Sequence, residues 1–393
     1  MWIAVAALGA IYVLSTVLTP LYPLYRHQFG ISELAVTVIY AVYVIGNLVV
    51  LFTLGRVSDQ IGRRATALLG LLLAAGSAVC FLFTNDLIGL GAGRVINGLA
   101  AGLGAGALTA WIAELEPSRD RARAAVIASA GNLGGLAVGA LGAGVLAQYA
   151  PWPLRLVFGV CVVLLCATAF CMPRVRETVK RPVRNVRSLA LQPRIGVPSG
   201  VRLVFAAPAC MAFTAFALGG FYAAVVPGLM TQRLHVSNVA DIGAVVALFF
   251  GTGSATAAMT GRVKGRTAMY GAVLLVLLGL TLLIVAEQES SLALLLAATV
   301  LAGGAVALGY RGSLEIVNEI APAERRAEVV SSYLLVCYTA NSLPVLGVGL
   351  LSLAVGPFEA HLSFAIVIAV LASVATVIGA RFLPYEELAI NVP

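Results

Sequence analysis

Two arginines stand inside stretches that are otherwise apolar, where charged side chains are rare. Arg94 lies in GRVINGLAAG, which also contains Asn97, and Arg311 lies in YRGSLEIVNE. A charge in the hydrocarbon of a membrane is costly unless it is paired or hydrated, so each arginine is a candidate for substrate contact or proton coupling. Glu315 follows Arg311 by four residues, and the two side chains therefore share one helical face. The alternatives are that carbonyl groups hold Arg94 and that Arg311 and Glu315 form a structural ion pair.

The composition indicates that membrane-spanning helices position these residues. Hydrophobic residues make up 61% of the 393 positions and charged residues 11%, with a mean hydropathy of +1.00. An ordinary soluble domain is roughly 45–50% apolar and about 25% charged. With about 20 apolar residues needed for each crossing, the sequence predicts an all-α membrane protein with twelve spans, near 2–25, 34–54, 65–84, 87–115, 123–149, 154–172, 203–229, 239–260, 268–286, 291–319, 327–353 and 360–382. Pro20 and Pro23 are expected to kink or end the first span.

The distribution of positive charge predicts the orientation of the spans. The gaps after the even-numbered spans, together with Arg381, hold 20 of the 25 lysines and arginines, whereas the other gaps hold Arg26, Arg155 and Arg233. By the positive-inside rule both termini are cytoplasmic. The net charge of +8 therefore belongs to short loops between apolar segments. We expect no nucleic-acid partner, because a nucleic-acid surface needs its basic residues on a water-facing side.

The chain divides at its longest polar gap, 173–202, which contains eight basic residues, one acidic residue and four prolines. We expect an N-terminal six-helix unit (1–172), a basic cytoplasmic linker (173–202) and a C-terminal six-helix unit (203–393). All six cysteines lie within apolar runs, which indicates small core residues rather than a disulfide framework or a metal pair.

Short matches between the two units support a duplication. The tripeptide Gly-Arg-Val at 55–57 recurs at 261–263. Similarly, Glu114 begins Glu-Leu-Glu-Pro and is followed by Arg121, while Glu319 begins Glu-Ile-Ala-Pro and is followed by Arg326. Transporters are often built from such internal repeats.

The segment after the second span has the spacing of a known loop signature. It is Gly55-Arg-Val-Ser-Asp59-Gln-Ile-Gly62-Arg63-Arg64, in which the glycines permit a tight reversal and Asp59 can cap or pair. Every fixed position matches the pattern G-x-x-x-D-x-x-G-R-[RK] of the major facilitator superfamily, which the chain resembles over its whole length.

This resemblance implies a fold and a mechanism. The fold is two six-helix bundles related by a pseudo-two-fold axis, each built of 3+3 inverted repeats, around a central cavity. The mechanism exposes a central site alternately to the two sides of the membrane, with Asp59 and Arg63 in a cytoplasmic latch. The alternative for this loop is a role in topology and folding alone.

Two further stretches resemble superfamily patterns within spans. Arg94, Gly98 and Gly102 match the span-4 pattern R-x-x-x-G-x-x-x-G, which implies that Arg94 takes part in proton coupling. The glycines around Asn132 in span 5 resemble the antiporter pattern, but Ala140 stands where that pattern has its proline. Close helix packing is the alternative explanation for these small residues.

Polar and aromatic residues on several predicted spans could line a central cavity that binds an amphipathic solute. With Arg94, Asn97, Arg311 and Glu315, the predicted coupling and substrate set contains Tyr12, Thr16, Tyr43, Asn47, Asn132, Tyr222, Tyr310, Tyr338 and Asn341. Any single tyrosine could instead belong to the interfacial belt or to the core. A second predicted set forms a cytoplasmic gate: Gly55, Asp59, Gly62, Arg63, Arg64, Glu114, Arg121, Glu319 and Arg326. We expect Glu114 and Glu319 to pair with Arg63 or Arg326.

Several chemistries are missing from the sequence. The three histidines, His27, His235 and His361, have no metal-ligand spacing, and neither a G-x-S-x-G elbow nor a P-loop occurs. We therefore expect no enzyme activity, no cofactor and no metal site, with a proton gradient as the energy source.

The sequence favours a secondary active transporter in a bacterial-type inner membrane, which exports a small amphipathic drug or metabolite in exchange for protons. Its expected partners are this small molecule, protons and the lipid bilayer, and by analogy with the superfamily it is a monomer. One alternative is uptake or exchange of a small organic anion or amino acid, because arginine geometry suits a carboxylate. Another is a non-transporting membrane receptor or assembly factor, for which the short outer loops leave little surface.

Overall fold

The computed structural model describes residues 1–54, 57–118, 120–179 and 195–382. These residues form α-helices with short 3-10 or π turns, and no β-strand occurs among them. Within this part of the chain, twelve helical segments are long and apolar enough to cross a membrane. The predicted all-helical architecture and number of spans are confirmed.

The first six spans lie between Trp2 and Arg174. They comprise α1 (Trp2–Val17), a 3-10 turn (Thr19–Leu21), α2 (Tyr22–Phe29), α3 (Glu33–Val49) with a π turn (Val50–Leu54), α4 (Val57–Ile61), α5 (Arg63–Phe83), α6 (Leu87–Leu115), α7 (Arg121–Tyr149), α8 (Leu156–Cys171) and a 3-10 turn (Met172–Arg174). The last six spans begin after a 3-10 turn (Ser199–Val201). They comprise α9 (Arg202–Ala224), α10 (Val226–Gln232), α11 (Val239–Met259), α12 (Gly265–Gln288), α13 (Leu292–Ile320), a 3-10 turn (Ala323–Arg325), α14 (Arg326–Val355) and α15 (Pro357–Phe382).

Proline interrupts the first helix of each half near the same end. Pro20 lies in the turn that follows α1, and Pro23 lies in the first turn of α2, as the sequence predicted. Pro227 lies in the first turn of α10 and separates α10 from α9, an interruption that the sequence analysis did not predict. Proline lacks a backbone N–H and fixes a helical φ, so it fits the first turn of a new helix. The two short helices, α2 and α10, contact each other.

Short polar side chains begin several of the long helices. Ser32 accepts a hydrogen bond from Ala35 N at the start of α3, and Asp86 accepts one from Gly89 N at the start of α6. Asn238 caps α11 in the same way. These caps satisfy backbone N–H groups that have no partner inside the helix.

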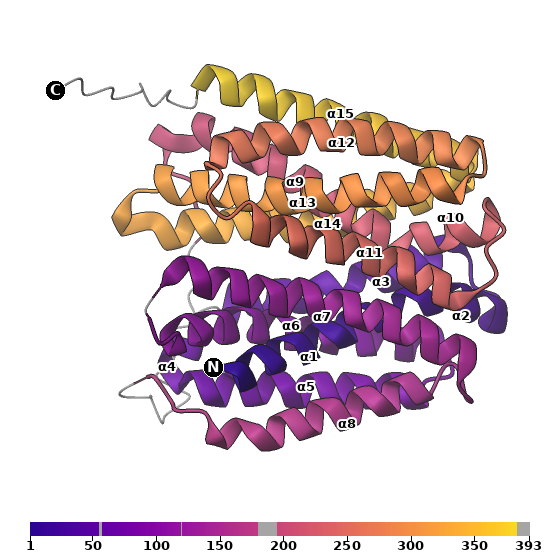
Figure 1. Ribbon diagram of the computed structural model, residues 1–393, viewed down its shortest axis with the longest axis horizontal. Helices are drawn as coiled ribbons and strands as arrows, with labels where there is room; N and C mark the ends of the chain where they lie inside the picture. The colour runs from indigo at the N-terminus through magenta and orange to yellow at the C-terminus, as the bar shows by residue number, and fades with distance from the viewer. Residues whose placement is uncertain (55–56, 119, 180–194, 383–393) are drawn as a thin grey trace.

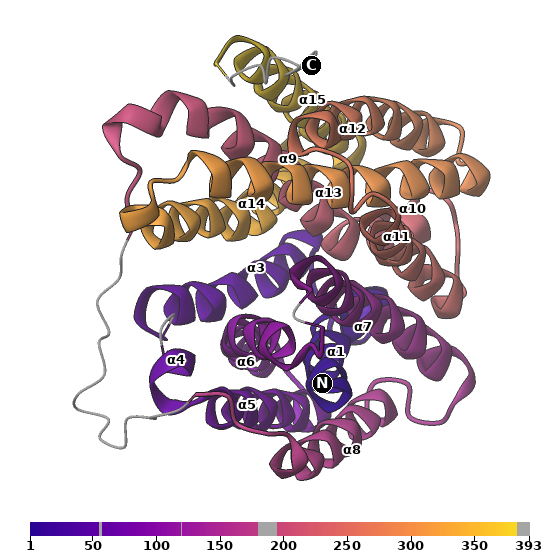
Figure 2. The same cartoon turned by 60° about the vertical axis from the view of Figure 1, so that its left-hand side comes forward.

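The helices gather in two groups (Figure 2). Helices α1 to α8 form one group, in which α5 packs on α6 and α1 on α7, and helices α9 to α15 form the other, in which α12 packs on α13 and α9 on α14. We call these groups the first and second halves. They meet where α7 packs on α11 and where α3 packs on α14. The residue boundaries of the predicted domains and the symmetry between them stay predictions.

The two ends of the bundle differ in how the halves touch. We call the end where α1 begins, α15 ends and α4 lies the terminal end, and the end with α2 and α10 the opposite end (Figure 1). Tyr40, in the part of α3 nearer the opposite end, donates a 3.1 Å hydrogen bond to Asn341 of α14. Farther toward that end, α3 and α14 approach so closely that a Cβ on Gly349 would collide with Thr37 Oγ1. These contacts join the halves on the side of the opposite end.

The outer surface of the helices is strongly apolar. Large side chains such as Ile88 (82% exposed), Phe83 (72%) and Leu72 (60%) point away from the rest of the protein. Exposure of this extent in water would favour aggregation, whereas lipid tails solvate such side chains. The chain is therefore a multi-pass membrane protein.

Candidate functional site

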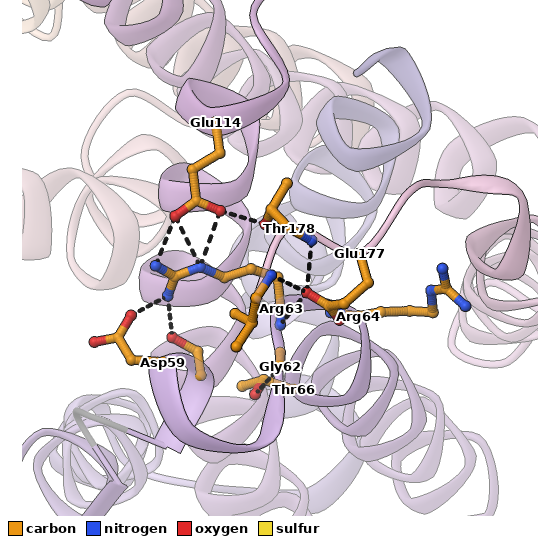
Figure 3. A network of polar contacts seen from close by, with 10 residues as sticks. Asp59, Gly62, Arg63, Arg64, Thr66, Glu114, Glu177 and Thr178 are labelled. Carbon is orange, nitrogen blue, oxygen red and sulfur yellow. Dashed lines mark hydrogen bonds and ion pairs between the residues drawn. The ribbon is translucent and has the colours of Figure 1, made fainter. Parts of the chain in front are cut away.

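The loop signature forms a polar network at the terminal end (Figure 3). Gly62 links α4 to α5 with a φ of +108°, a conformation that side chains other than glycine rarely adopt. Arg63, the first residue of α5, then extends between α4 and α6. Its Nη1 lies 2.5 Å from Asp59 Oδ1 and its Nη2 lies 2.8 Å from Glu114 Oε1, while Ser58 accepts a further hydrogen bond at 2.7 Å. The ion pair between Arg63 and Glu114 is present as expected, and its role as a gate stays a prediction.

The beginning of the linker completes this network. Glu177 accepts hydrogen bonds from the backbone N–H groups of Arg63, at 3.1 Å, and Arg64, at 2.9 Å, and so caps the start of α5. Thr178 donates a hydrogen bond to Glu114. A Cβ on Gly62 would lie 2.8 Å from Glu177 Oε2, so the glycine also makes room for this carboxylate. Sequence analysis missed both linker residues, because an isolated acidic residue in a basic linker gives no sign of a partner far along the chain.

The charge of Glu177 is stabilised by backbone groups. Burial on its own would raise the pKa of Glu177, but the N–H groups of Val179, Arg64, Arg63 and Thr178 outweigh it, and the pKa lies below its usual range. Hydrogen bonds to an ionised carboxylate favour that form. Glu177 is therefore a negative group held at the positive N-terminus of α5.

A comparable arrangement occurs in the second half. Glu315 on α13 accepts a 3.0 Å hydrogen bond from Gly265 N at the start of α12. Arg311 donates to the Val263 carbonyl oxygen, and its Nη2 lies 3.8 Å from Glu315 Oε2. The two residues thus hold the loop between α11 and α12. They lie nearer the terminal end than residues of a central substrate site would. Their predicted role in coupling stays a prediction, beside this structural contact.

Arg94 is buried inside the first half, toward the opposite end. It is 1% exposed, its Nη1 donates to the Ser15 carbonyl oxygen at 3.0 Å, and its Nε has no hydrogen-bond partner. The guanidinium carbon lies 5.2 Å from the ring centre of Tyr40 and 5.1 Å from that of Tyr43, within cation–π distance. No carboxylate in the described part of the chain forms an ion pair with Arg94. One carbonyl and two rings therefore replace the counter-ion that a buried charge usually has.

Three of the predicted tyrosines lie near a fourth, Tyr12. Tyr12 of α1 lies near Tyr43 of α3 and, from the second half, near Tyr310 of α13 and Tyr338 of α14. Asn132 of α7 also lies near Tyr12. Each of these five side chains is partly accessible rather than fully buried. We call the four rings the tyrosine cluster; its members come from both halves, and one of them, Tyr43, lies against Arg94.

Other residues of the predicted substrate set lie elsewhere. Thr16 bonds to the Leu136 carbonyl oxygen at 2.7 Å and joins α1 to α7. Tyr222 stacks on Phe249 within the second half, with ring centres 4.4 Å apart. Asn47 and Asn97 are 2% and 0% exposed, and Asn97 has no partner for either amide atom.

The remaining gate residues lie at separate places around the terminal end. Arg64 donates to the Val175 carbonyl oxygen at 2.8 Å. Glu319 and Arg326 are both exposed, in the last turn of α13 and at the start of α14. The side chain of Arg121 and the whole of Gly55 lie outside the described residues. At this end of α14 an ion pair forms between Arg325 and Glu328, at 2.7 Å.

The small residues of α7 allow close contact with two neighbours. A Cβ on Gly139 would collide with the Val13 carbonyl oxygen of α1. On the second half, a Cβ on Gly243 of α11 would lie 2.5 Å from the carbonyl oxygen of Ala140. Ala140 itself is fully buried. Close packing thus explains Gly139 and Gly243, whereas a Cβ on Gly134 or Gly142 would meet open space, and the resemblance to the antiporter pattern stays a prediction.

Two further polar features have no place in either predicted set. The first is the pair Glu177 and Thr178 described above. The second is a buried contact between His361 and Glu287 at the opposite end, 2.8 Å apart. Within the described residues, no group of three or more His, Cys, Asp or Glu side chains could hold a metal ion.

The twelve spans, the loop network and the paired halves define a transporter-like membrane protein, and comparison with known proteins identifies its family. The family model of the Major Facilitator Superfamily matches residues 4–343. The chain belongs to this superfamily, which carries small molecules across membranes.

Similarity to individual proteins is more limited. The chain is 32% identical over 183 residues to the MFS efflux transporter aclA of Aspergillus oryzae, a match that covers 45% of this chain and 31% of that protein. It is 25% identical over 104 residues to the quinolone resistance protein NorA of Staphylococcus aureus, covering 26% and 27%. These matches thus span about a third or less of each relative.

Two solved structures share the fold. One is a bacterial homologue of the human lysosomal transporter Spinster in an inward-facing and unoccupied conformation, with a TM-score of 0.74 and 14% identity over 97% of this chain and 96% of that chain. The other is a POT family transporter in complex with 5-aminolevulinic acid, with a TM-score of 0.76 and 14% identity over 98% and 96%.

Proposed function

We propose that this protein is a secondary active transporter that exports a small amphipathic compound in exchange for protons by alternating access. The terminal end faces the cytoplasm of a bacterial-type inner membrane, in agreement with the excess of basic residues there. The two partial relatives, an efflux transporter and a drug-resistance protein, support export. The protein works as a monomer of two six-helix bundles.

One observation carries this proposal: two consecutive contacts link Arg94 to Tyr40 and Tyr40 to Asn341. Arg94 lies against the ring of Tyr40, and the hydroxyl of Tyr40 donates to Asn341 in the other half. A solute or proton that changes the position of Arg94 therefore acts on a contact that joins the halves. A secondary transporter needs this property, since occupancy of its site must change the equilibrium between conformations.

The tyrosine cluster supports an amphipathic substrate. Its rings come from both halves, so a bound molecule would contact both and would respond to their relative movement. Aromatic rings bind apolar surface and cations, and their hydroxyl groups offer hydrogen bonds. In the contacts described here, the halves are joined toward the opposite end. We interpret this arrangement as the state that opens to the cytoplasm and accepts a substrate from there.

The state of Arg94 also favours a second candidate function, transport of a small organic anion. Arg94 forms no ion pair with a carboxylate in the described residues, and its Nε has no hydrogen-bond partner. A carboxylate of a substrate could occupy that position, because guanidinium groups bind carboxylates in a bidentate way.

Flux in liposomes separates the two functions. The purified protein would be placed in liposomes that contain a pH-sensitive dye, and an imposed proton gradient would be discharged by lipophilic cations, neutral drugs or small organic anions. Export in exchange for protons predicts discharge by the cations or drugs and its loss in Arg94→Ala. Discharge by anions alone would favour the second candidate. No solute-dependent flux with any compound would contradict both.

A further inference from the structure

A buried cluster of ionisable side chains lies at the opposite end, away from the tyrosine cluster and from the loop network. His361 of α15 is 2% exposed and Glu287 of α12 is 3% exposed. His361 Nδ1 lies 2.8 Å from Glu287 Oε2, and Arg233 Nε, in the loop after α10, lies 3.6 Å from Glu287 Oε1. The fourth member, Glu33, begins α3 of the first half, and its Oε1 lies 3.9 Å from His361 Nε2. The cluster therefore spans the boundary between the halves.

The position of the hydrogen on a neutral His361 ring follows from taking Glu287, which lies next to Arg233, as ionised. An ionised carboxylate only accepts hydrogen bonds, so the Nδ1 that faces Glu287 carries the hydrogen. Arg233 stabilises the negative charge on the other oxygen of Glu287. Nε2 then has a free lone pair; it is buried and has no hydrogen-bond partner. The nitrogen that faces Glu33 is thus a vacant position for one proton.

The other surroundings of His361 are a ring and a polar cavity. From α9, the ring of Phe221 lies nearly perpendicular to the imidazole, with ring centres 5.4 Å apart. In the described part of the chain, the ion pairs of His361 are those with Glu287 and Glu33. A cavity of about 610 Å³ adjoins the cluster and is lined by Arg233, Glu287, His235 and Glu359 among others. This cavity is polar, lies at the opposite end and reaches Glu287, whose side chain is itself buried.

We propose that His361 Nε2 is a proton-binding site whose occupancy fastens α15 to α3 and holds the halves together at the opposite end. With the proton, an imidazolium lies between two carboxylates, and one of these, Glu33, belongs to the other half. Without the proton, a lone pair faces Glu33 at 3.9 Å, which is unfavourable. The site is thus a contact between the halves that becomes stronger as the medium at the opposite end becomes more acidic. This inference rests on the proposed function only in assuming that the halves separate at that end.

The direction of the pH effect follows from linkage. Glu33 lies beside His361 only while the opposite end is closed, so a protonated His361 gains its ion pair with Glu33 in the closed state alone. Acidification therefore raises the ratio of closed to open protein, by at most about tenfold for each pH unit when one proton is involved. The effect is absent where either the proton site or Glu33 is removed.

Distance measurements at the opposite end test this proposal. Spin labels would be placed at Gln28→Cys on α2 and Ser237→Cys before α11, both at exposed positions, in full-length protein whose six native cysteines are replaced by alanine. Pulsed EPR in lipid nanodiscs between pH 5 and 8 gives the closed fraction. We expect the ratio of closed to open protein to rise severalfold on acidification in the parent protein, and to respond little in His361→Gln or Glu33→Gln.

Matched variants keep the outcome interpretable. His235→Gln removes another histidine at the same end, which lines the cavity without contacting Glu33, and should leave the pH response unchanged. Glu33→Gln covers the case in which loss of the buried His361 prevents folding, because the side chain of Glu33 is 16% exposed at the edge of the cluster. A pH response that persists in both cluster variants, or that disappears in His235→Gln, would overturn the proposal. If the distance responds to a transported solute but not to pH, this proposal fails while the transport function stands; if it responds to neither, both fail.

Discussion

Tyr40 of α3 donates a hydrogen bond to Asn341 of α14 across the boundary between the halves, at 3.1 Å. The same Tyr40 ring lies over the buried charge of Arg94. One side chain thus connects the most buried cation of the described residues to a contact that opening must break. This relationship gives the proposed transport cycle a definite physical step.

The Tyr40–Asn341 contact should set the balance between open and closed states at the opposite end. Tyr40→Phe keeps the ring over Arg94 and removes a hydrogen bond worth about 0.5–1.5 kcal/mol net, so we expect the closed fraction to fall about two- to tenfold relative to the open one. Asn341→Ala should have a similar effect, and the double variant should add little. The Gln28/Ser237 label pair measures the ratio, with Tyr43→Phe as a control that leaves Asn341 untouched. Additive effects would show that the two residues act separately.

Transport should require the guanidinium group of Arg94 and not only its positive charge. The hydrogen bond from its Nη1 and its two contacts with aromatic rings depend on the planar guanidinium group. The ammonium group of lysine does not reproduce this geometry. Loss of a hydrogen bond to a charged group costs about 1.5–3 kcal/mol, so Arg94→Ala should lower the transport rate at least about tenfold, with Arg94→Lys recovering a small part. Initial rates in liposomes are the measurement, and thermal unfolding checks that the variants are folded. Full activity of Arg94→Lys would contradict the role of the guanidinium group.

Glu177 should hold the start of the linker against the first turn of α5. Glu177→Ala removes the cap of α5, which is worth about 1 kcal/mol, and should expose the chain after Arg176 to trypsin. The rate of cleavage at that bond measures the effect. Thr178→Val serves as the control, because it keeps the α5 cap and removes only the bond to Glu114. Unchanged cleavage in Glu177→Ala would show that the contact contributes nothing to the position of the linker.

The same contact should depend on pH in one direction. The folded protein lowers the pKa of Glu177, because backbone N–H groups outweigh the opposing effect of burial. The contribution to stability is therefore fully present above the unfolded pKa of about 4.3, and it is lost as the pH falls through the lower folded value. The difference in melting temperature between the parent protein and Glu177→Gln should be constant near neutral pH and shrink in acid below a pH of about 4.3. A difference that grows on acidification would contradict this assignment.

Two substitutions of Glu315 distinguish a coupling role from a structural one. Glu315→Gln keeps an oxygen that can accept from Gly265 N but cannot exchange a proton, whereas Glu315→Ala loses both properties. If the residue only holds the loop, Glu315→Gln should transport normally and Glu315→Ala should be less stable by about 1 kcal/mol. If it carries the proton, both variants lose solute-dependent proton flux. The geometry favours the first outcome.

The sequence predicted the parts of this protein that depend on local pattern. Twelve apolar runs specify twelve spans because backbone groups in lipid must bond within their own helix. The spacing of Asp59, Gly62 and Arg63 likewise specifies a capped turn and an ion pair. Contacts between distant segments were not predictable in this way, because nothing near Glu177 in the chain indicates α5, and nothing near His361 indicates Glu33. The sequence placed Arg311 and Glu315 on one helical face, and the structure agrees. Their position on that face gave no information about their partner, which is the loop at 263–265.

Alternating access itself is tested most directly by comparing the two ends of the bundle in one sample series. The Gln28/Ser237 label pair reports the opposite end, and a second pair at the exposed positions Ala113→Cys of α6 and Ala327→Cys of α14 reports the terminal end. On addition of a transported solute, the account predicts that one distance lengthens while the other shortens, and that Arg94→Ala abolishes the exchange. The account would be contradicted if both distances changed in the same direction. It would also be contradicted if neither distance changed with any solute that discharges the proton gradient.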